Sequence, residues 1–153
     1  MMTMAVTISD ASIRYLDRLY AIEKECFDKE AFTRQQIAAL LTDYNSISLI
    51  AKKNSEIVGF IIGTIHVEKN TLAGHILTID VTPTHRRKGI AQLLLREIEK
   101  IFKEKDVKTC RLEVRENNAA ALALYQKLGY SKIAKLENYY RNGHGIYLRK
   151  DLT

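Results

Sequence analysis

The chain has 153 residues, of which 46% are hydrophobic and 27% charged, a composition typical of one globular domain, which we expect to span residues 1–153. It contains no run of 18 apolar residues and begins without the basic and apolar regions of a signal peptide, so we expect neither a membrane partner nor secretion. The formal net charge of +6 suits an anionic partner, either nucleic acid or a phosphate-bearing cofactor, or else a solvated basic surface. Two cysteines, Cys26 and Cys110, are too few for a disulfide framework, so we expect buried free thiols and a cytoplasmic location.

The first half of the chain predicts one strand, two helices and a hairpin. Residues 6–9 form a short strand candidate, and Asp10 offers an N-cap to a helix whose apolar residues recur at spacings of three and four. Thr33 offers the cap of a second helix. β-Branched residues over 48–52 and 57–67, separated by a turn-like break, predict two paired strands.

The second half predicts two more helices and four more strands. These are, in chain order, a strand over 74–81, a helix over 88–105, a strand over 109–114, a helix over 118–128, and strands over 130–134 and 145–148. In the first of these strands we expect alternate residues from His75 to Val81 to share one face. The order predicts an α+β fold, a mixed sheet covered by helices.

The stretch between the strand ending at residue 81 and the long helix has the chemistry of an anion site. A helix N-terminus presents unpaired N–H groups, and Gly89 has no Cβ to block a close approach. Arg86, Arg87 and Lys88 add positive charge, and Ala91 keeps the next position small. A diphosphate therefore fits better than the alternative, a plain helix start with a basic first turn, because the helix dipole disfavours basic residues there. Neither a Walker A loop nor a dinucleotide fingerprint is present.

Two motifs carry a family resemblance. The stretch Arg86-x-x-Gly89-x-Ala91 resembles the acetyl-CoA motif of the GNAT superfamily. Residues 112–130 are similar to the Leu-Glu-Val-Arg-x-x-Asn-x-x-Ala-x-x-Leu-Tyr-x-x-x-Gly-Phe pattern of RimI-like and arrest-defective-type N-terminal acetyltransferases, with Tyr130 in place of Phe. The resemblance implies a GNAT fold, in which a mostly antiparallel sheet of about seven strands contains one splayed parallel pair and is flanked by four helices.

The resemblance also implies an activity and a cofactor. It implies transfer of the acetyl group of acetyl-CoA to the N-terminal α-amine of proteins or peptides by direct attack in a ternary complex. Glu113 would be the general base, Glu30 is the alternative base, and Tyr125 would be the general acid. The residues implied in cofactor binding are Ile79, Val81, Arg86, Arg87, Lys88, Gly89, Ile90, Ala91, Asn118 and Tyr125.

The sequence also allows other roles for these residues and other acceptors. Taken alone, Glu113 suits an ion pair with Arg111 or Arg115, and Tyr125 suits core packing. Deprotonation at pH 7 costs about 1.4 kcal/mol for an α-amine and about 4.6 kcal/mol for lysine, which favours the α-amine. Lysine side chains, small-molecule amines and a non-catalytic nucleic-acid-binding module are the alternatives, of which we expect the last least.

The acceptor site and the partners are also predicted from the resemblance. Phe27 and Glu30 follow the first helix, and Tyr139 and Tyr140 belong to a hairpin that covers the first residues of the peptide in this family. The family's usual acidic position in that hairpin is occupied by Gly145. No His and Cys spacing indicates a metal site. Whether the ribosome or an auxiliary subunit takes part stays open.

Overall fold

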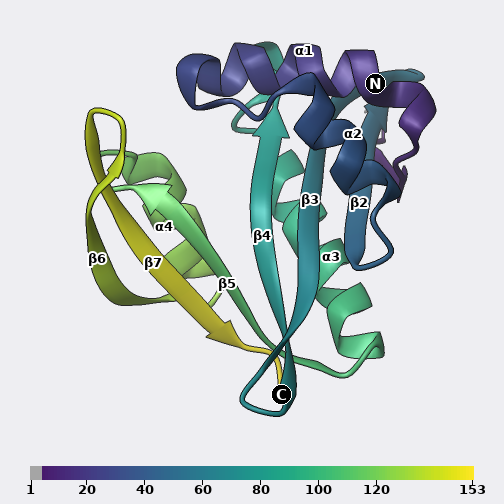
Figure 1. The fold of residues 1–153 in the computed structure, drawn as a ribbon. Helices are drawn as coiled ribbons and strands as arrows, with labels where there is room; N and C mark the ends of the chain where they lie inside the picture. Colours follow the sequence, from purple (N-terminus) through teal and green to yellow (C-terminus); the bar gives the residue numbers. More distant parts are fainter. Residues whose placement is uncertain (1–4) are drawn as a thin grey trace.

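A single mixed sheet of seven strands organises the computed structural model, which describes residues 5–153 (Figure 1). The strands are β1 (Thr7–Asp10), β2 (Ser46–Lys53), β3 (Glu56–Glu68), β4 (Thr71–Val81), β5 (Val107–Arg115), β6 (Ser131–Tyr140) and β7 (Gly143–Asp151). Their order across the sheet is β1-β2-β3-β4-β5-β7-β6, and every neighbouring pair is antiparallel except β4 and β5. The predicted mixed sheet with one parallel pair is confirmed.

Four α-helices cover the two faces of the sheet. They are α1 (Leu16–Phe27), α2 (Arg34–Thr42), α3 (Ile90–Glu104) and α4 (Ala119–Lys127). Helices α1 and α2 lie on one face, where Leu19 and Ile37 pack with Phe60 of β3. Helices α3 and α4 lie on the other, where Leu94 of α3 packs with Ile61 of β3. Alternate residues of β3 thus enter two separate cores, as the two-residue period of a strand requires.

The ends of the helices depart from the sequence-based expectations at two points. Thr33 caps α2 as predicted, in a capping box with Gln36. The prediction for Asp10 is wrong, because this residue ends β1 and α1 begins only at Leu16, after a short 3-10 turn. Helix α3 begins at Ile90 instead of residue 88, since the preceding glycine adopts a left-handed conformation that cannot continue a helix backward.

Strand β4 contains a β-bulge, beyond which the residues that would have faced one side of the sheet face the other. Thr78 lies opposite Ile62 of β3, whereas Ile76 lies opposite Gly63, so β4 has one extra residue between them. The expected alternation from His75 to the end of the strand is therefore wrong. Before the bulge His75 lies on the α1 face, and after it Thr78 lies on that face too.

The parallel pair β4 and β5 is joined along only part of its length. The paired residues run from Leu72 to His75 in β4 and from Val107 to Arg111 in β5. Beyond this short ladder the two strands diverge, and the gap opens toward the end of the molecule where α1 lies (Figure 1). In open sheets with parallel strands, such a point is where ligands bind.

A candidate active site between the diverging strands

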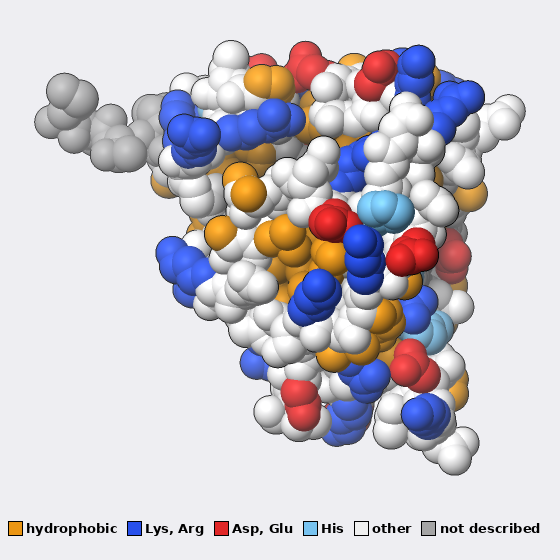
Figure 2. Space-filling model, turned by 90° about the vertical axis from the view of Figure 1, so that its left-hand side faces the viewer, with side chains coloured by type: hydrophobic (Ala, Val, Ile, Leu, Met, Phe, Trp, Pro, Cys, Tyr) orange, Lys and Arg blue, Asp and Glu red, His pale blue; other side chains and the backbone are white. Residues whose placement is uncertain are grey.

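A cavity of about 790 Å³ fills the gap between β4 and β5. It runs from the segment that opens α3 and from α4 to the loop between α1 and α2 and the tip of the β6–β7 hairpin. The volume lies in the range of small-molecule and cofactor sites. Figure 2 shows hydrophobic side chains gathered in the middle of one face, with basic and acidic side chains around them.

The segment that opens α3 has the backbone of an anion site. Gly89 has φ +80°, and Arg87 has φ 62°, so both lie in the left-handed region. A Cβ added at Gly89 would meet no atom within 4 Å, which leaves the surface of the turn open. Since the first intrahelical bond here is from the Leu93 N–H to the Gly89 carbonyl, the N–H groups between them are free for a ligand.

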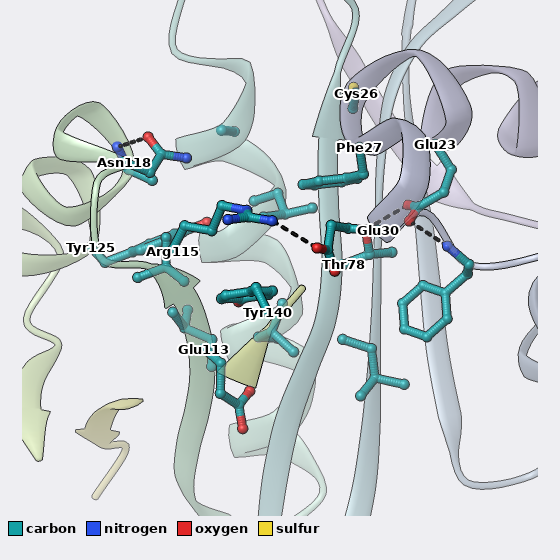
Figure 3. A pocket seen from close by; sticks show the side chains of 18 of the residues that line it. Glu23, Cys26, Phe27, Glu30, Thr78, Glu113, Arg115, Asn118, Tyr125 and Tyr140 are labelled. Atoms are coloured by element: carbon teal, nitrogen blue, oxygen red, sulfur yellow. Dashed lines mark hydrogen bonds and ion pairs between the residues drawn. The ribbon is translucent and has the colours of Figure 1, made fainter. Parts of the chain in front are cut away.

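The structure brings most of the predicted cofactor residues to this cavity. Six of them line it, namely Ile79, Val81, Arg86, Ala91, Asn118 and Tyr125. Arg87, Lys88 and Gly89 lie in the turn beside it, and the Ile90 side chain is buried in the α3 core. Ile90 can thus contribute only backbone atoms. Asn118 caps α4, because its side-chain carbonyl accepts from the Ala121 N–H at 3.1 Å, and this leaves its amide N–H₂ for the cofactor (Figure 3).

Arg86 and Cys26 meet at the wall of the cavity. The Arg86 guanidinium donates from Nε to the Val81 carbonyl at 3.1 Å and from Nη2 to Cys26 Sγ at 3.4 Å. The expectation of a buried thiol is confirmed for Cys110 and wrong for Cys26, which is half-buried and lines the cavity. Burial raises the pKa of Cys26, so its thiol is neutral at pH 7.

Glu113 of β5 forms a close pair with His75 of β4, a residue for which the sequence predicted no role in the site. His75 Nε2 lies 2.7 Å from Glu113 Oε2, and the two side chains are only 19% and 14% exposed. Glu113 therefore pairs with neither Arg111 nor Arg115, the partners that the sequence suggested. A carboxylate bonded to an imidazole is a candidate proton acceptor, because the carboxylate is held in place and the imidazole has a second nitrogen that can accept a proton.

Glu30, the alternative base, occupies a different arrangement. Its Oε1 accepts from Arg115 Nη2 at 2.7 Å and from the Arg141 N–H at 3.1 Å, so it bridges the α1–α2 loop, β5 and the β6–β7 hairpin (Figure 3). The same Arg115 guanidinium lies over the Tyr140 ring, with 4.8 Å from Cζ to the ring centroid. The Arg115 guanidinium and the Arg141 N–H therefore already occupy Oε1 of Glu30, whereas among residues 5–153 Glu113 has His75 as its one partner. This geometry favours Glu113 as base.

Tyr125 of α4 is well placed to remain protonated. Its side chain is buried beside the cavity, and its ring lies edge-on to Tyr130 with 6.1 Å between centroids. Burial raises the pKa of Tyr125 well above its ordinary value. The phenol therefore carries a proton throughout the physiological range, as a general acid must.

The predicted acceptor residues gather at the mouth of the cavity. Phe27, Glu30, Tyr139 and Tyr140 all line it. The rings of Tyr139 and Tyr140 pack edge-to-face with 4.9 Å between centroids. A Cβ at Gly145 would lie 3.1 Å from Tyr139 and 3.2 Å from Tyr140, so the absence of a side chain there allows this packing. The departure from the family's acidic residue thus has a steric consequence.

Comparison with known proteins identifies the family. The model described as "Acetyltransferase (GNAT) family" matches residues 16–130. The chain belongs to the GNAT family. It is 33% identical over 117 residues to an N-alpha-acetyltransferase of Sulfurisphaera tokodaii, with 71% of this chain and 70% of the relative covered. It is 36% identical over 102 residues to the ribosomal protein bS18-alanine N-acetyltransferase of Haemophilus influenzae, covering 67% and 65%.

Solved structures agree with this assignment. Ard1 from Thermoplasma volcanium superposes with a TM-score of 0.88 at 25% identity, covering 97% of this chain and 99% of that one. The ribosomal-protein-S18-alanine N-acetyltransferase of Escherichia coli superposes with a TM-score of 0.85 at 25% identity, covering 97% and 95%. The chain is therefore an N-acetyltransferase that uses acetyl-CoA. The open turn at Gly89 and the free amide of Asn118 fit that cofactor.

The role of His75 in the site could not be predicted from the sequence. His75 faces Glu113 only because β4 and β5 are parallel in one particular register and because the bulge sets its face, neither of which periodicity reveals. A histidine between apolar neighbours, Gly74 and Ile76, was the one available signal. Among residues 5–153, no group of three or more His, Cys, Asp and Glu side chains is arranged to hold a metal ion.

Proposed function

We propose that this GNAT protein acetylates the N-terminal α-amine of proteins or peptides by direct transfer in a ternary complex. The observation that carries the proposal is one continuous cavity, which runs from Arg86 and Ala91 beside the open turn before α3 to a mouth lined by Phe27, Tyr139 and Tyr140. The Glu113–His75 pair and Tyr125 lie along the same cavity. The relatives named N-alpha-acetyltransferase and bS18-alanine N-acetyltransferase support the choice of an N-terminal amine.

The cofactor is held at the α3 and α4 end of the cavity. Backbone N–H groups from Arg87 to Ala91 bind the diphosphate, as helix N-termini do in other anion sites, and the Asn118 amide donates to the cofactor arm. When bound, acetyl-CoA supplies a thioester carbonyl and a thiol leaving group. Binding both reactants in one cavity converts a bimolecular encounter into a reaction between positioned groups.

The acceptor amine loses its proton at the Glu113–His75 pair. An ammonium group is attracted to the Glu113 carboxylate, and the proton passes to the pair directly or through one water molecule. His75 holds the carboxylate through its Nε2–H, which donates to Glu113 Oε2, and its free Nδ1 gives the pair a second site for a proton. The cost of about 1.4 kcal/mol at pH 7 for an α-amine is within reach of such a base, whereas about 4.6 kcal/mol for lysine demands a stronger one.

Tyr125 acts on the leaving group. A thiolate is the charged product of the transfer, and a phenol that stays protonated at neutral pH can stabilise this charge through a hydrogen bond and donate its proton. A free thiol has an ordinary pKa of about 8.5, so at pH 7 the thiolate ends protonated.

Initial rates on matched peptides test the proposal. One series carries a free N-terminus and varies its first residue, and its controls are the same peptides with a blocked N-terminus and one internal lysine. We expect turnover only on the free N-termini, with rates that depend on the first residue, which contacts Phe27 and the two tyrosines. Turnover on the blocked peptides, or on small amines alone, would contradict the choice of acceptor.

The setting of the enzyme is part of the same proposal. Two free cysteines, Cys26 and Cys110, support a cytoplasmic protein, since such thiols persist in a reducing compartment. Within residues 5–153, the structure has no helix of the length and apolar character needed to cross a membrane. That residues 1–153 form one acetyltransferase domain, and that the ribosome or an auxiliary subunit assists, stay predictions.

A further inference from the structure

Two buried carboxyl groups lie behind the acceptor end of the cavity. Glu23 of α1 and Asp80 of β4 are each 1% exposed, and Thr78 of β4 lies between them. Thr78 Oγ1 is 2.7 Å from Glu23 Oε1 and 2.6 Å from Asp80 Oδ1. Glu23 and Thr78 line the cavity, while Asp80 lies one step deeper, near the strand end. The roles given above to Glu113, His75 and Tyr125 do not use this cluster.

The geometry of the cluster requires one extra proton. A hydroxyl has a single hydrogen, so Thr78 can donate to only one of the two carboxyl oxygens. The other short contact is a hydrogen bond only if that carboxyl group is protonated and donates to Thr78 Oγ1. Two ionised carboxylates this close, out of water, would also repel each other strongly.

The proton belongs on Asp80. Glu23 accepts at both oxygens, from Thr78 and from the Phe32 N–H at 3.0 Å, which suits a carboxylate (Figure 3). Asp80 Oδ2 is buried without a hydrogen-bond partner among residues 5–153, an arrangement that is far less costly for a neutral carboxyl than for a charged one. Burial, and then Glu23, raise the pKa of Asp80 well above its ordinary value.

The chain of bonds ends on the loop that carries the acceptor site. With the proton on Asp80, its carboxyl donates to Thr78 across the 2.6 Å contact, and the Thr78 hydroxyl donates to Glu23, which also accepts from the Phe32 N–H. Phe32 closes the α1–α2 loop, whose residues Asp28 to Glu30 line the mouth of the cavity beside Phe27 at the end of α1. The three side chains therefore tie this loop to β4.

We infer that Asp80 is a positioning residue which, in its protonated form, fixes the α1–α2 loop against β4 through Thr78 and Glu23 in the geometry that binds the acceptor. The inference rests on the proposed function only in naming the acceptor as a peptide N-terminus. Loss of the Asp80 proton places two negative charges around Thr78 and loosens the loop, so acceptor binding weakens as pH rises.

Ionisation of Asp80 would act on the other charged and titratable groups that surround it. They are Glu23 and Cys26 on α1, Arg86 in the turn after β4, and Tyr125 on α4. An Asp80 carboxylate raises the pKa of Tyr125 and so weakens it as an acid. The neutral form thus serves both acceptor binding and proton donation to the leaving group.

Carboxyl NMR on the intact protein tests the proton directly. Aspartate side chains are labelled with ¹³C at the carboxyl carbon and titrated from about pH 4, near the ordinary aspartate pKa, to about pH 9. One resonance, absent in Asp80→Asn, should remain protonated at pH 7. The matched control Asp106→Asn removes an exposed aspartate and should leave that resonance in place. Titration of the Asp80 resonance near the ordinary value would overturn the inference, whatever the substrate of the enzyme proves to be.

Kinetics separate positioning from a general loss of structure. Thr78→Val removes the hydroxyl and with it both hydrogen bonds of the cluster, so it should raise the peptide KM about tenfold or more, with the acetyl-CoA Kd unchanged. Thr78→Ser keeps the hydroxyl and should restore the KM. Asp80→Asn can still donate to Thr78 and should keep the KM at pH 7 while abolishing its rise at alkaline pH. An unchanged KM in Thr78→Val, or an equal loss of acetyl-CoA binding, would overturn the positioning role. Absence of any α-amine acetylation by the unmodified protein would instead reject the proposed function.

Discussion

The Glu113–His75 pair makes a quantitative prediction about catalysis. Replacing Glu113 with Gln keeps its shape and removes the carboxylate, and replacing His75 with Gln keeps a hydrogen-bonding group without a titratable ring. Loss of a general base costs about 10² to 10⁴ in rate, or about 2.7 to 5.4 kcal/mol at 1.36 kcal/mol per decade. The two side chains are joined at 2.7 Å and are mostly withdrawn from water, so we expect them to act as one unit.

Residues that act as one unit show non-additive losses. If Glu113→Gln lowers kcat about 10³-fold and His75→Gln about 10²-fold, independent effects would multiply to about 10⁵-fold. We expect the double variant to be no slower than about 10³-fold, a coupling energy of about 2.7 kcal/mol.

Single-turnover rates, with enzyme and acetyl-CoA both in excess over the peptide, measure the chemical step in the wild type, the two single variants and the double variant. Glu116→Gln, which removes an exposed carboxylate paired with Lys135, is the control and should leave the rate unchanged. Multiplicative losses in the double variant would refute the shared-proton role, as would a wild-type rate in His75→Gln.

Three further changes test other parts of the site. Tyr125→Phe should lower kcat about 10²-fold or more with little change in the acetyl-CoA Kd, measured by calorimetry, because only proton donation is lost; a wild-type kcat would exclude the acid role. Gly145→Asp places a side chain within 3.1 Å of Tyr139 and should raise the peptide KM without weakening acetyl-CoA binding, and unchanged peptide kinetics would show that the ring packing is irrelevant. Tyr130→Phe restores the family's residue but removes a 2.7 Å hydrogen bond to the buried Glu99, which should cost about 1.5 to 3 kcal/mol of unfolding free energy in chemical denaturation; no loss would show that the Lys150–Glu99 bond suffices.

The fold was predictable where local pattern and family motif agree. The order of strands and helices follows from apolar periodicity, and the apolar stripe of α3 and the Thr33 cap of α2 are where the sequence placed them. The start of α3 differs because Gly89 adopts a left-handed conformation, a choice that the sequence permits without requiring. Strand β6 continues to Tyr140, beyond the expected end at residue 134, because pairing with β7 overrides its exposed and polar character.

The chemistry of the site was predictable only in part. Family motifs located Glu113, Tyr125 and the turn before α3, and the structure brings the first two to one cavity. The partners of Glu113 and Glu30 depend on side chains brought together across 38 and 85 residues of sequence, and no local rule supplies such contacts. The Glu23–Thr78–Asp80 cluster depends on the bulge in β4, which turns Thr78 toward α1.

The position of the transferred acetyl group tests the central claim most directly. A single peptide with a free N-terminus and one internal lysine is incubated with the protein and acetyl-CoA, and fragment-ion mass spectrometry locates the added acetyl group. We expect the acetyl group on the α-amine, at a rate that falls sharply in Glu113→Gln and Tyr125→Phe. Acetyl on the lysine alone, or α-acetylation at an unchanged rate in both variants, would contradict the assignment of acceptor and site.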